Sequence, residues 1–208
     1  GLDLNNDIVS GLTAGKSHID DLSDLDIDEM LKKDFSVTTD SSCIGQADVV
    51  VICVPTPLSA DGGPDLGAVI SASKSVSENL KTGSLVILES TTYPGTTEEI
   101  VLPILEKSGL KLGEFDLAFS PERIDPGNQV FGMANTPKVV GGVDAKSGDS
   151  AVGFYSKFVE SVVRARSAKE AEMAKLLENT YRHVNIALMN ELVEFSNLLD
   201  IDLWNAID

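Results

Sequence analysis

Cysteine is scarce in this sequence, and that scarcity argues against two kinds of site. Only Cys43 and Cys53 occur among the 208 residues, and their spacing fits neither a zinc site nor a redox-active pair. Cys53 lies inside an apolar run, so we expect a buried thiol there. We therefore predict no metal site and a reducing, cytoplasmic location.

Positive charge is also scarce. The chain has 16 Lys and Arg against 33 Asp and Glu, which gives a formal net charge of −17. This balance argues against a nucleic-acid partner, because a phosphate backbone demands clustered Lys and Arg. A negatively charged small ligand stays compatible, since a local pocket can be positive on an acidic protein. Residues 20–29 concentrate the acidity, and we expect a solvated acidic face there.

Long apolar runs are missing as well. No run approaches the roughly 20 residues that span a bilayer, and no basic segment precedes an apolar one as in a signal peptide. We predict no membrane insertion. The sequence also lacks an initiator methionine, and it stops at Asp208 inside a helical pattern. We expect both ends to be internal to a longer chain.

What is present is an alternation of short apolar runs with helical stretches, which is typical of a parallel sheet with crossover helices. Residues 49–54 are apolar throughout, as expected of a strand buried on both faces. The expected strands are 1–4, 35–38, 49–54, 85–89, 117–120, 138–141 and 161–164. The expected helices are 6–14, 65–80, 96–106, 145–159 and 168–199.

These patterns predict an α/β fold: a doubly wound parallel, Rossmann-like sheet whose first strand is missing. We expect this domain to span residues 1–164 and a separate helical region to begin over 165–208. Ligands of such sheets bind beyond the carboxyl ends of the strands. The residues that follow each strand are therefore the first candidates for a site.

The first candidates could contact a dinucleotide. An acidic residue at a strand end, here Asp3, can hydrogen-bond the ribose hydroxyls of NAD, although many strand-end aspartates only cap a turn. The usual Gly-x-Gly-x-x-Gly loop is nowhere in the chain. Val54, Pro55 and Thr56 close the most buried strand in a rigid turn whose hydroxyl can reach a phosphate or ribose. A plain strand-ending turn would look the same.

Three further groups offer polar side chains to a substrate. Residues 90–92 place three hydroxyls in a row before a helix, where they could bind an oxyanion or a water. The stiff loop around Glu122, Arg123 and Ile124 holds charges at the sheet edge, where they could bind a substrate. The alternative is that these charges form only exposed salt bridges. Lys175 and Asn179 are four apart on one helical face, and Arg182 continues the stripe. Such a stripe can stabilise an oxyanion, yet on most helices it is solvated surface.

The order of these motifs resembles that of the UDP-glucose/GDP-mannose dehydrogenase family over essentially the whole chain. The forms around Ser120 and Glu178 are most similar to the members that act on UDP-N-acetylglucosamine or its relatives. The motifs are a strand-end Asp, then V-P-T-P, E-S-T-T-Y-P-G-T-T, S-P-E-R-I-D-P-G-N, K-V-V-G-G and A-K-L-L-E-N-T-Y-R-H-V-N-I-A-L-M-N-E.

The resemblance implies a four-electron oxidation of the C6 alcohol of a UDP-sugar, with two NAD and a thiohemiacetal and thioester on a cysteine. It implies catalytic roles for Glu122, Lys175, Asn179 and Thr91, with Thr91 holding a water. NAD contacts fall on Asp3, Val54, Pro55, Thr56, Ser90 and Thr91. Contacts with the UDP-sugar fall on Glu122, Arg123, Ile124, Lys175, Asn179 and Arg182. The long helix from residue 168 begins the family's central region, through which we expect a homodimer.

Three departures from the family pattern matter. The Gly-rich loop, the segment with the nucleophilic cysteine and the C-terminal UDP-binding domain are all missing, and Cys43 and Cys53 match no catalytic position. We therefore expect these 208 residues alone to bind NAD poorly and to be inactive. The alternatives are a UDP-glucose 6-dehydrogenase, a two-electron hydroxyacid-type dehydrogenase and a non-catalytic remnant of an NAD fold.

Overall fold

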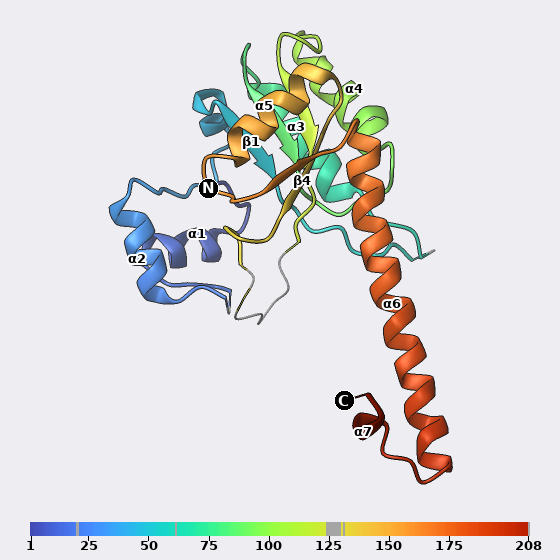
Figure 1. Cartoon of the computed structure of the whole chain (residues 1–208). Coiled ribbons are helices and arrows are strands. Elements are labelled where there is room, and N and C mark those ends of the chain that lie inside the picture. The colour runs from blue at the N-terminus through green and yellow to red at the C-terminus, as the bar shows by residue number, and fades with distance from the viewer. Residues whose placement is uncertain (20, 61, 124–129, 131, 208) are drawn as a thin grey trace.

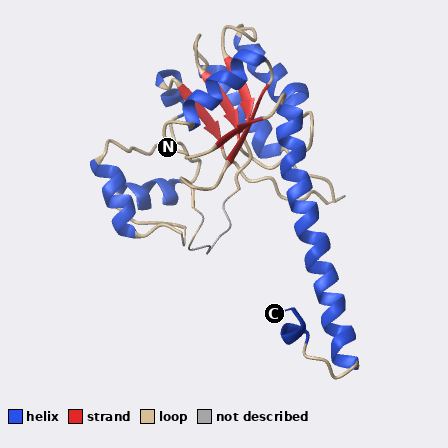
Figure 2. Cartoon of the chain, in the orientation of Figure 1, coloured by secondary structure: helices blue, strands red, loops and turns tan. Residues whose placement is uncertain are grey.

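The computed structural model describes residues 1–19, 21–60, 62–123, 130 and 132–207. Its centre is a five-stranded sheet in the order β1-β2-β3-β4-β5 (Figure 2). The expected α/β class is confirmed. The strands are β1 Val49–Ile52, β2 Leu85–Leu88, β3 Asp116–Phe119, β4 Lys138–Gly142 and β5 Val162–Arg164.

The sheet is parallel except at one junction. Strands β1, β2 and β3 pair in parallel, as do β4 and β5. Strand β4 runs antiparallel to β3, with Ala118 opposite Gly142 and Phe119 opposite Gly141. The sheet is therefore mostly parallel, as expected, and its pairing departs from the expected pattern only between β3 and β4. The carboxyl ends of β1, β2 and β3 lie at one edge, and the antiparallel direction brings the start of β4 to that same edge.

Helices cover both faces of the sheet (Figure 1). Along β2, Val86 and Leu88 pack into one core cluster, and Leu85 and Ile87 pack into the other. This alternation follows from the period of two in a strand. The first cluster includes α3 and the start of α6, and the second includes α5. The helices are α1 Asn6–Thr13, α2 Asp24–Lys32, α3 Gly67–Asn79, α4 Leu102–Leu105, α5 Ala145–Tyr155, α6 Ala168–Leu198 and α7 Leu203–Ile207, with short helical turns at Ser41–Gln46 and Glu106–Ser108.

The two earliest expected strands do not form. Segments 1–4 and 35–38 pair as an isolated parallel bridge between Leu2 and Thr38 rather than as strands. The Asp3 N–H donates to Thr38 O at 3.2 Å, and the Thr38 N–H donates to Gly1 O at 3.0 Å. A pair of segments without neighbouring strands has too few hydrogen bonds to propagate a ladder.

Two helical segments also differ from expectation. Helix α2 begins within the acidic region, and its N-cap Ser23 forms a capping box with Asp26. Its acidic residues are exposed as expected, and Ile27 is buried beneath them. The expected helix 96–106 begins as a π-helix, Thr97–Val101, before α4 continues it. It follows Gly95, whose φ of +104° suits glycine alone.

Helix α6 begins against the domain core and extends far beyond it (Figure 1). Ser167 caps its start by accepting from the Glu170 N–H, and Ala168 and Ala171 are fully buried. A Cβ on Gly141 of β4 would lie 2.1 Å from Ser167 O, so the glycine permits this close approach. Within the described residues, no helix, α6 included, combines the length and the apolar character needed to cross a membrane.

Candidate functional site

The loops that follow β1 and β2 are bound to each other. Thr56 Oγ1 donates to Thr91 O at 2.7 Å, and Ser90 Oγ donates to Val54 O at 2.7 Å. Two motifs 35 residues apart in sequence are thereby brought together at the carboxyl edge of the sheet. The hydroxyls of Thr56 and Ser90 hold the loops in place, while Thr91 faces solvent and Pro55 is exposed.

Asp3 stands apart from these loops in its contacts. Its Oδ1 accepts from the Asn5 N–H at 2.8 Å, and Asn5 in turn caps α1 by accepting from the Asp7 N–H. Within the described residues, no hydrogen bond or ion pair of Asp3 reaches residues 54–56 or 90–91. The Asp3 carboxylate therefore caps a local turn, which is the structural alternative to a role in binding NAD.

The loop after β3 is tied to α6. Lys175 Nζ donates to the Glu122 carbonyl oxygen. Arg123 forms a two-pronged ion pair with Glu178, with Nε at 3.2 Å from Oε2 and Nη2 on Oε1, and its Nη1 donates to Pro137 O at 2.7 Å. A fork of this kind fixes both partners in orientation as well as distance. Ile124, also expected in this loop, lies outside the described residues.

The stripe predicted on α6 lines a groove of about 460 Å³. Its charged lining residues are Arg123, Lys175 and Arg182 against the single carboxylate of Glu178, so the groove is locally positive on a chain of net charge −17. Such a groove suits an anionic ligand. Its lining comprises Arg123, Lys175, Glu178, Asn179, Tyr181, Arg182, Asn185 and Ile186.

The sequence reasoning missed Glu178. This residue lies three positions after Lys175 and four before Arg182, on the same helical face. Its spacing is the signal that could have found it. In the structure it holds Arg123 beside the groove and leaves Lys175 and Asn179 as neighbours along α6.

A second missed group lies at the same sheet edge. Lys138 Nζ is 2.7 Å from Glu89 Oε1, with 7% and 12% of the two side chains exposed. The Tyr155 hydroxyl donates to Glu89, and Lys138 Nζ lies 5.0 Å from the Tyr155 ring centroid. Glu89 directly precedes Ser90, so this buried ion pair anchors the base of the hydroxyl-bearing loop.

Cys53 corrects an expectation. The residue is exposed rather than buried, because it follows the last residue of β1, and its Sγ lies 3.8 Å from Glu89 Oε2. Partial burial of the thiol and the negative charge of Glu89 raise the pKa of Cys53 to about 11. Because the thiolate is the reactive form, Cys53 is a poor nucleophile at neutral pH.

The donor set fits part of a dinucleotide. Asp3 offers a carboxylate of the kind that ribose hydroxyls require, and Thr91 offers an exposed hydroxyl. Beside it, Thr92 Oγ1 is buried without a hydrogen-bond partner in the described part of the chain. The sequence supplies no glycine-rich cradle for the pyrophosphate. Over the same described ranges, no three His, Cys, Asp or Glu side chains gather to hold a metal ion.

Individual relatives resemble the chain along nearly all its length. It is 38% identical over 205 residues to protein CapL of Staphylococcus aureus, covering 97% of this chain and 48% of that protein. It is 37% identical to a UDP-N-acetyl-D-glucosamine 6-dehydrogenase of Pseudomonas aeruginosa, covering 97% and 48%. A solved UDP-D-ManNAc dehydrogenase from Pyrococcus horikoshii superposes with a TM-score of 0.93 at 36% identity, covering 100% and 50%.

The chain thus spans about half the length of the curated relatives that it matches. Two family models account for almost all of it. Residues 1–159 match the NAD binding domain of the UDP-glucose/GDP-mannose dehydrogenase family, and residues 169–208 match the central domain of that family. The chain belongs to the UDP-glucose/GDP-mannose dehydrogenase family, and it carries that family's NAD-binding domain.

Proposed function

We propose that the complete protein containing this chain is an NAD-dependent UDP-sugar 6-dehydrogenase. Its substrate in this proposal is UDP-N-acetylglucosamine or UDP-N-acetylmannosamine, oxidised at C6 to the uronic acid. The observation that carries the proposal is the positive groove, in which Lys175 and Asn179 stand together beside Arg123. The names of the relatives, which include dehydrogenases of both sugars, support the substrate class.

The proposed roles follow the chemistry of each group. Lys175 and Asn179 stabilise the oxyanion that develops at C6, since a cation and an amide can both donate to it. Thr91 holds a water, and Glu122 acts as general base or in hydrolysis. Asp3, Val54, Pro55, Thr56, Ser90 and Thr91 bind NAD. Glu122, Arg123, Ile124, Lys175, Asn179 and Arg182 contact the UDP-sugar.

The number of NADH formed per sugar tests the reaction. We expect the complete protein to form two NADH for each UDP-N-acetylglucosamine or UDP-N-acetylmannosamine consumed, measured by absorbance, and to turn over UDP-glucose less well. One NADH per sugar would instead indicate a two-electron dehydrogenase of the hydroxyacid type. A folded protein that forms no NADH with any of the three sugars would indicate a non-catalytic NAD-binding fold.

The same proposal includes the domain division, 1–164 and 165–208, and a cytoplasmic location. The division places the boundary just before Ser167, which caps α6. The location is supported by the two cysteines, both of which are free. Neither statement depends on which UDP-sugar is the substrate.

We also propose that the protein forms a homodimer through α6. Beyond its buried start, this helix exposes many large apolar side chains, and a contiguous apolar face of this kind marks an interface. A second copy of the same helix would cover it. The exposed residues are Met173, Leu176, Leu177, Tyr181, Val184, Ile186, Leu188, Leu192, Phe195 and Leu198.

Light scattering tests the dimer. We expect the complete protein to have the mass of a dimer and Leu188→Asp to shift it toward the monomer, because the variant buries a charge at the interface. Asn190→Asp, which adds the same charge at another exposed position of α6, serves as the control and should leave the dimer intact. A monomeric wild type with α6 ordered would contradict the proposal.

A further inference from the structure

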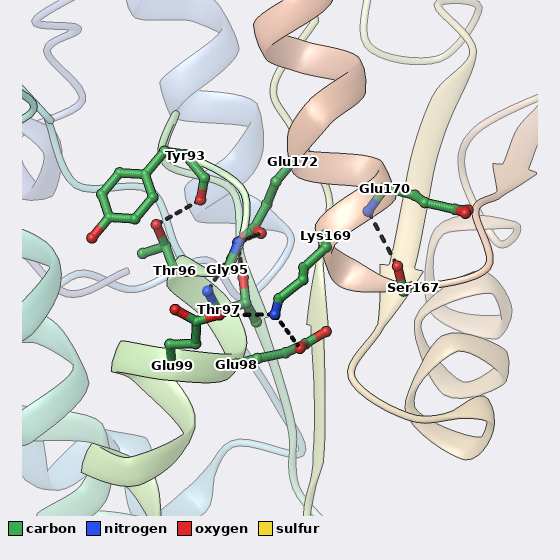
Figure 3. Close-up of polar contacts among 10 residues, drawn as sticks. All are labelled: Tyr93, Gly95, Thr96, Thr97, Glu98, Glu99, Ser167, Lys169, Glu170 and Glu172. Carbon is green, nitrogen blue, oxygen red and sulfur yellow. Dashed lines mark hydrogen bonds and ion pairs between the residues drawn. The ribbon is translucent and has the colours of Figure 1, made fainter.

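Glu172 is a fully buried carboxylate on α6 that binds the turn after β2 (Figure 3). Its Oε2 accepts from the Gly95 N–H at 2.6 Å. Its Oε1 accepts from both the N–H and the hydroxyl of Thr97, at 2.9 Å and 2.6 Å. One side chain thus joins segments that are 75 and 77 residues apart in the sequence.

A carboxylate is costly to bury, and among the described residues this one is compensated by three hydrogen bonds. Burial raises the pKa of Glu172, while the hydrogen bonds from Thr97 and Gly95 act in the opposite direction. Removing the carboxylate would leave buried backbone N–H groups without an acceptor, which is a costly arrangement. The contact therefore strongly fixes the position of α6 relative to the Gly95–Thr97 turn.

The neighbouring ion pairs are a weaker link between the same segments. Lys169 Nζ lies 2.8 Å from Glu99 Oε1 and 3.3 Å from Glu98 Oε2, with 45% of the Lys169 side chain exposed. Exposed pairs of this kind contribute little. Of these polar contacts between α6 and the turn, Glu172 is consequently the strongest.

Each of the two segments joined by this contact also carries proposed site residues. On α6, Lys175 is three residues beyond Glu172 and Asn179 is seven beyond it, both within two helical turns. On the other side, Gly95 and Thr97 follow Thr91 by four and six residues in the same segment. Glu172 therefore links the helix that carries the groove residues to the segment that carries Thr91.

We propose that Glu172 is a positioning residue that holds Lys175 and Asn179 in register with the loop carrying Thr91. The inference rests on the proposed dehydrogenase function. In this role, the carboxylate of Glu172 keeps Lys175 and Asn179, which contact the substrate, at a fixed distance from the loop that contacts the cofactor. A displacement of about 1 Å in such an arrangement can cost on the order of 100-fold in rate.

Glu172→Gln in the complete protein tests the proposal. Glutamine keeps the shape but turns an NH2 group toward donors, so at least one of the three hydrogen bonds is lost. We expect kcat to fall at least about tenfold, with the KM values for NAD and the UDP-sugar nearly unchanged. Glu170→Gln is the matched control, because it removes the same charge from the same helix at an exposed position, and it should leave kcat unchanged.

Thr97 provides a second pair of variants in case Glu172→Gln does not fold. Thr97→Val removes the hydroxyl donor with little change of shape, and Thr97→Ser retains it. We expect a lower kcat in Thr97→Val and recovery in Thr97→Ser. A purely structural contribution would lower the unfolding temperature of Thr97→Val without this loss of kcat.

Hydrogen exchange at the Gly95 and Thr97 amides reports the contact independently of activity. Faster exchange in Glu172→Gln together with reduced kcat supports the proposal. Faster exchange with an unchanged kcat, or no change in either, overturns it. A wild-type protein without turnover on any UDP-sugar would instead refute the proposed function, and this role with it.

Discussion

Lys175→Met in the complete protein is expected to lower kcat by about 100- to 1,000-fold, the usual loss when one donor to a developing oxyanion is removed. Lys175 is half-buried on α6, and its ammonium group already donates to the Glu122 carbonyl oxygen at the rim of the groove. It is thereby held in place before any substrate binds. Steady-state NADH formation measures the effect.

The matched control is Lys111→Met, which removes the same charge from an exposed pair with Glu106 at 3.4 Å. It should leave kcat unchanged. Lys175→Arg should not restore activity, because a planar guanidinium cannot take the place of a compact ammonium group. Circular dichroism would establish that each variant folds. A Lys175→Met variant within about twofold of the wild-type kcat, against the 100-fold expected, would remove Lys175 from the catalytic machinery.

The sequence was sufficient for the sheet core and for the groove. Strands β1, β2 and β3 coincide with short continuous apolar runs, and Lys175, Asn179 and Arg182 share a helical face by spacing alone. Hydrophobic pattern carries no strand direction, so the antiparallel run of β4 was not predictable from it. The segments 1–4 and 35–38 have strand-like composition but lack the neighbouring strands that would extend their pairing.

The missed features have three different physical causes. Glu172, Glu89 and Lys138 depend on partners far away in the sequence, and local spacing does not reveal such pairs. Helix α2 was hidden by its acidic composition, although the Ser23 and Asp26 capping box was available as a signal. Cys53 was predicted to be buried because it lies in an apolar run, whereas its exposure depends on where β1 ends.

The buried pair of Glu89 and Lys138 supports the second large expected effect. Lys138→Met should lower the free energy of unfolding by about 3–5 kcal/mol, because it leaves the carboxylate of Glu89 buried without its counter-ion. Tyr155 still donates to that carboxylate, but a hydroxyl cannot replace a positive charge. Urea-induced unfolding followed by circular dichroism measures the loss. Lys81→Met is the control, since its pair with Asp48 is exposed, with 39% and 93% of the side chains accessible, and should cost at most about 1 kcal/mol.

A double-mutant cycle separates the charge pair from its packing. In Glu89→Leu/Lys138→Met both charges are gone, and the remaining defect is the Tyr155 hydroxyl, now without its acceptor, at about 1–3 kcal/mol. Adding Tyr155→Phe should recover most of that loss. The double variant is therefore expected to be more stable than Lys138→Met alone, even though it carries more substitutions. If Lys138→Met costs no more than Lys81→Met, then the ion pair does not fix the base of the Ser90–Thr91 loop. In that case the hydrogen bonds from Thr56 and Ser90 alone would have to hold that loop.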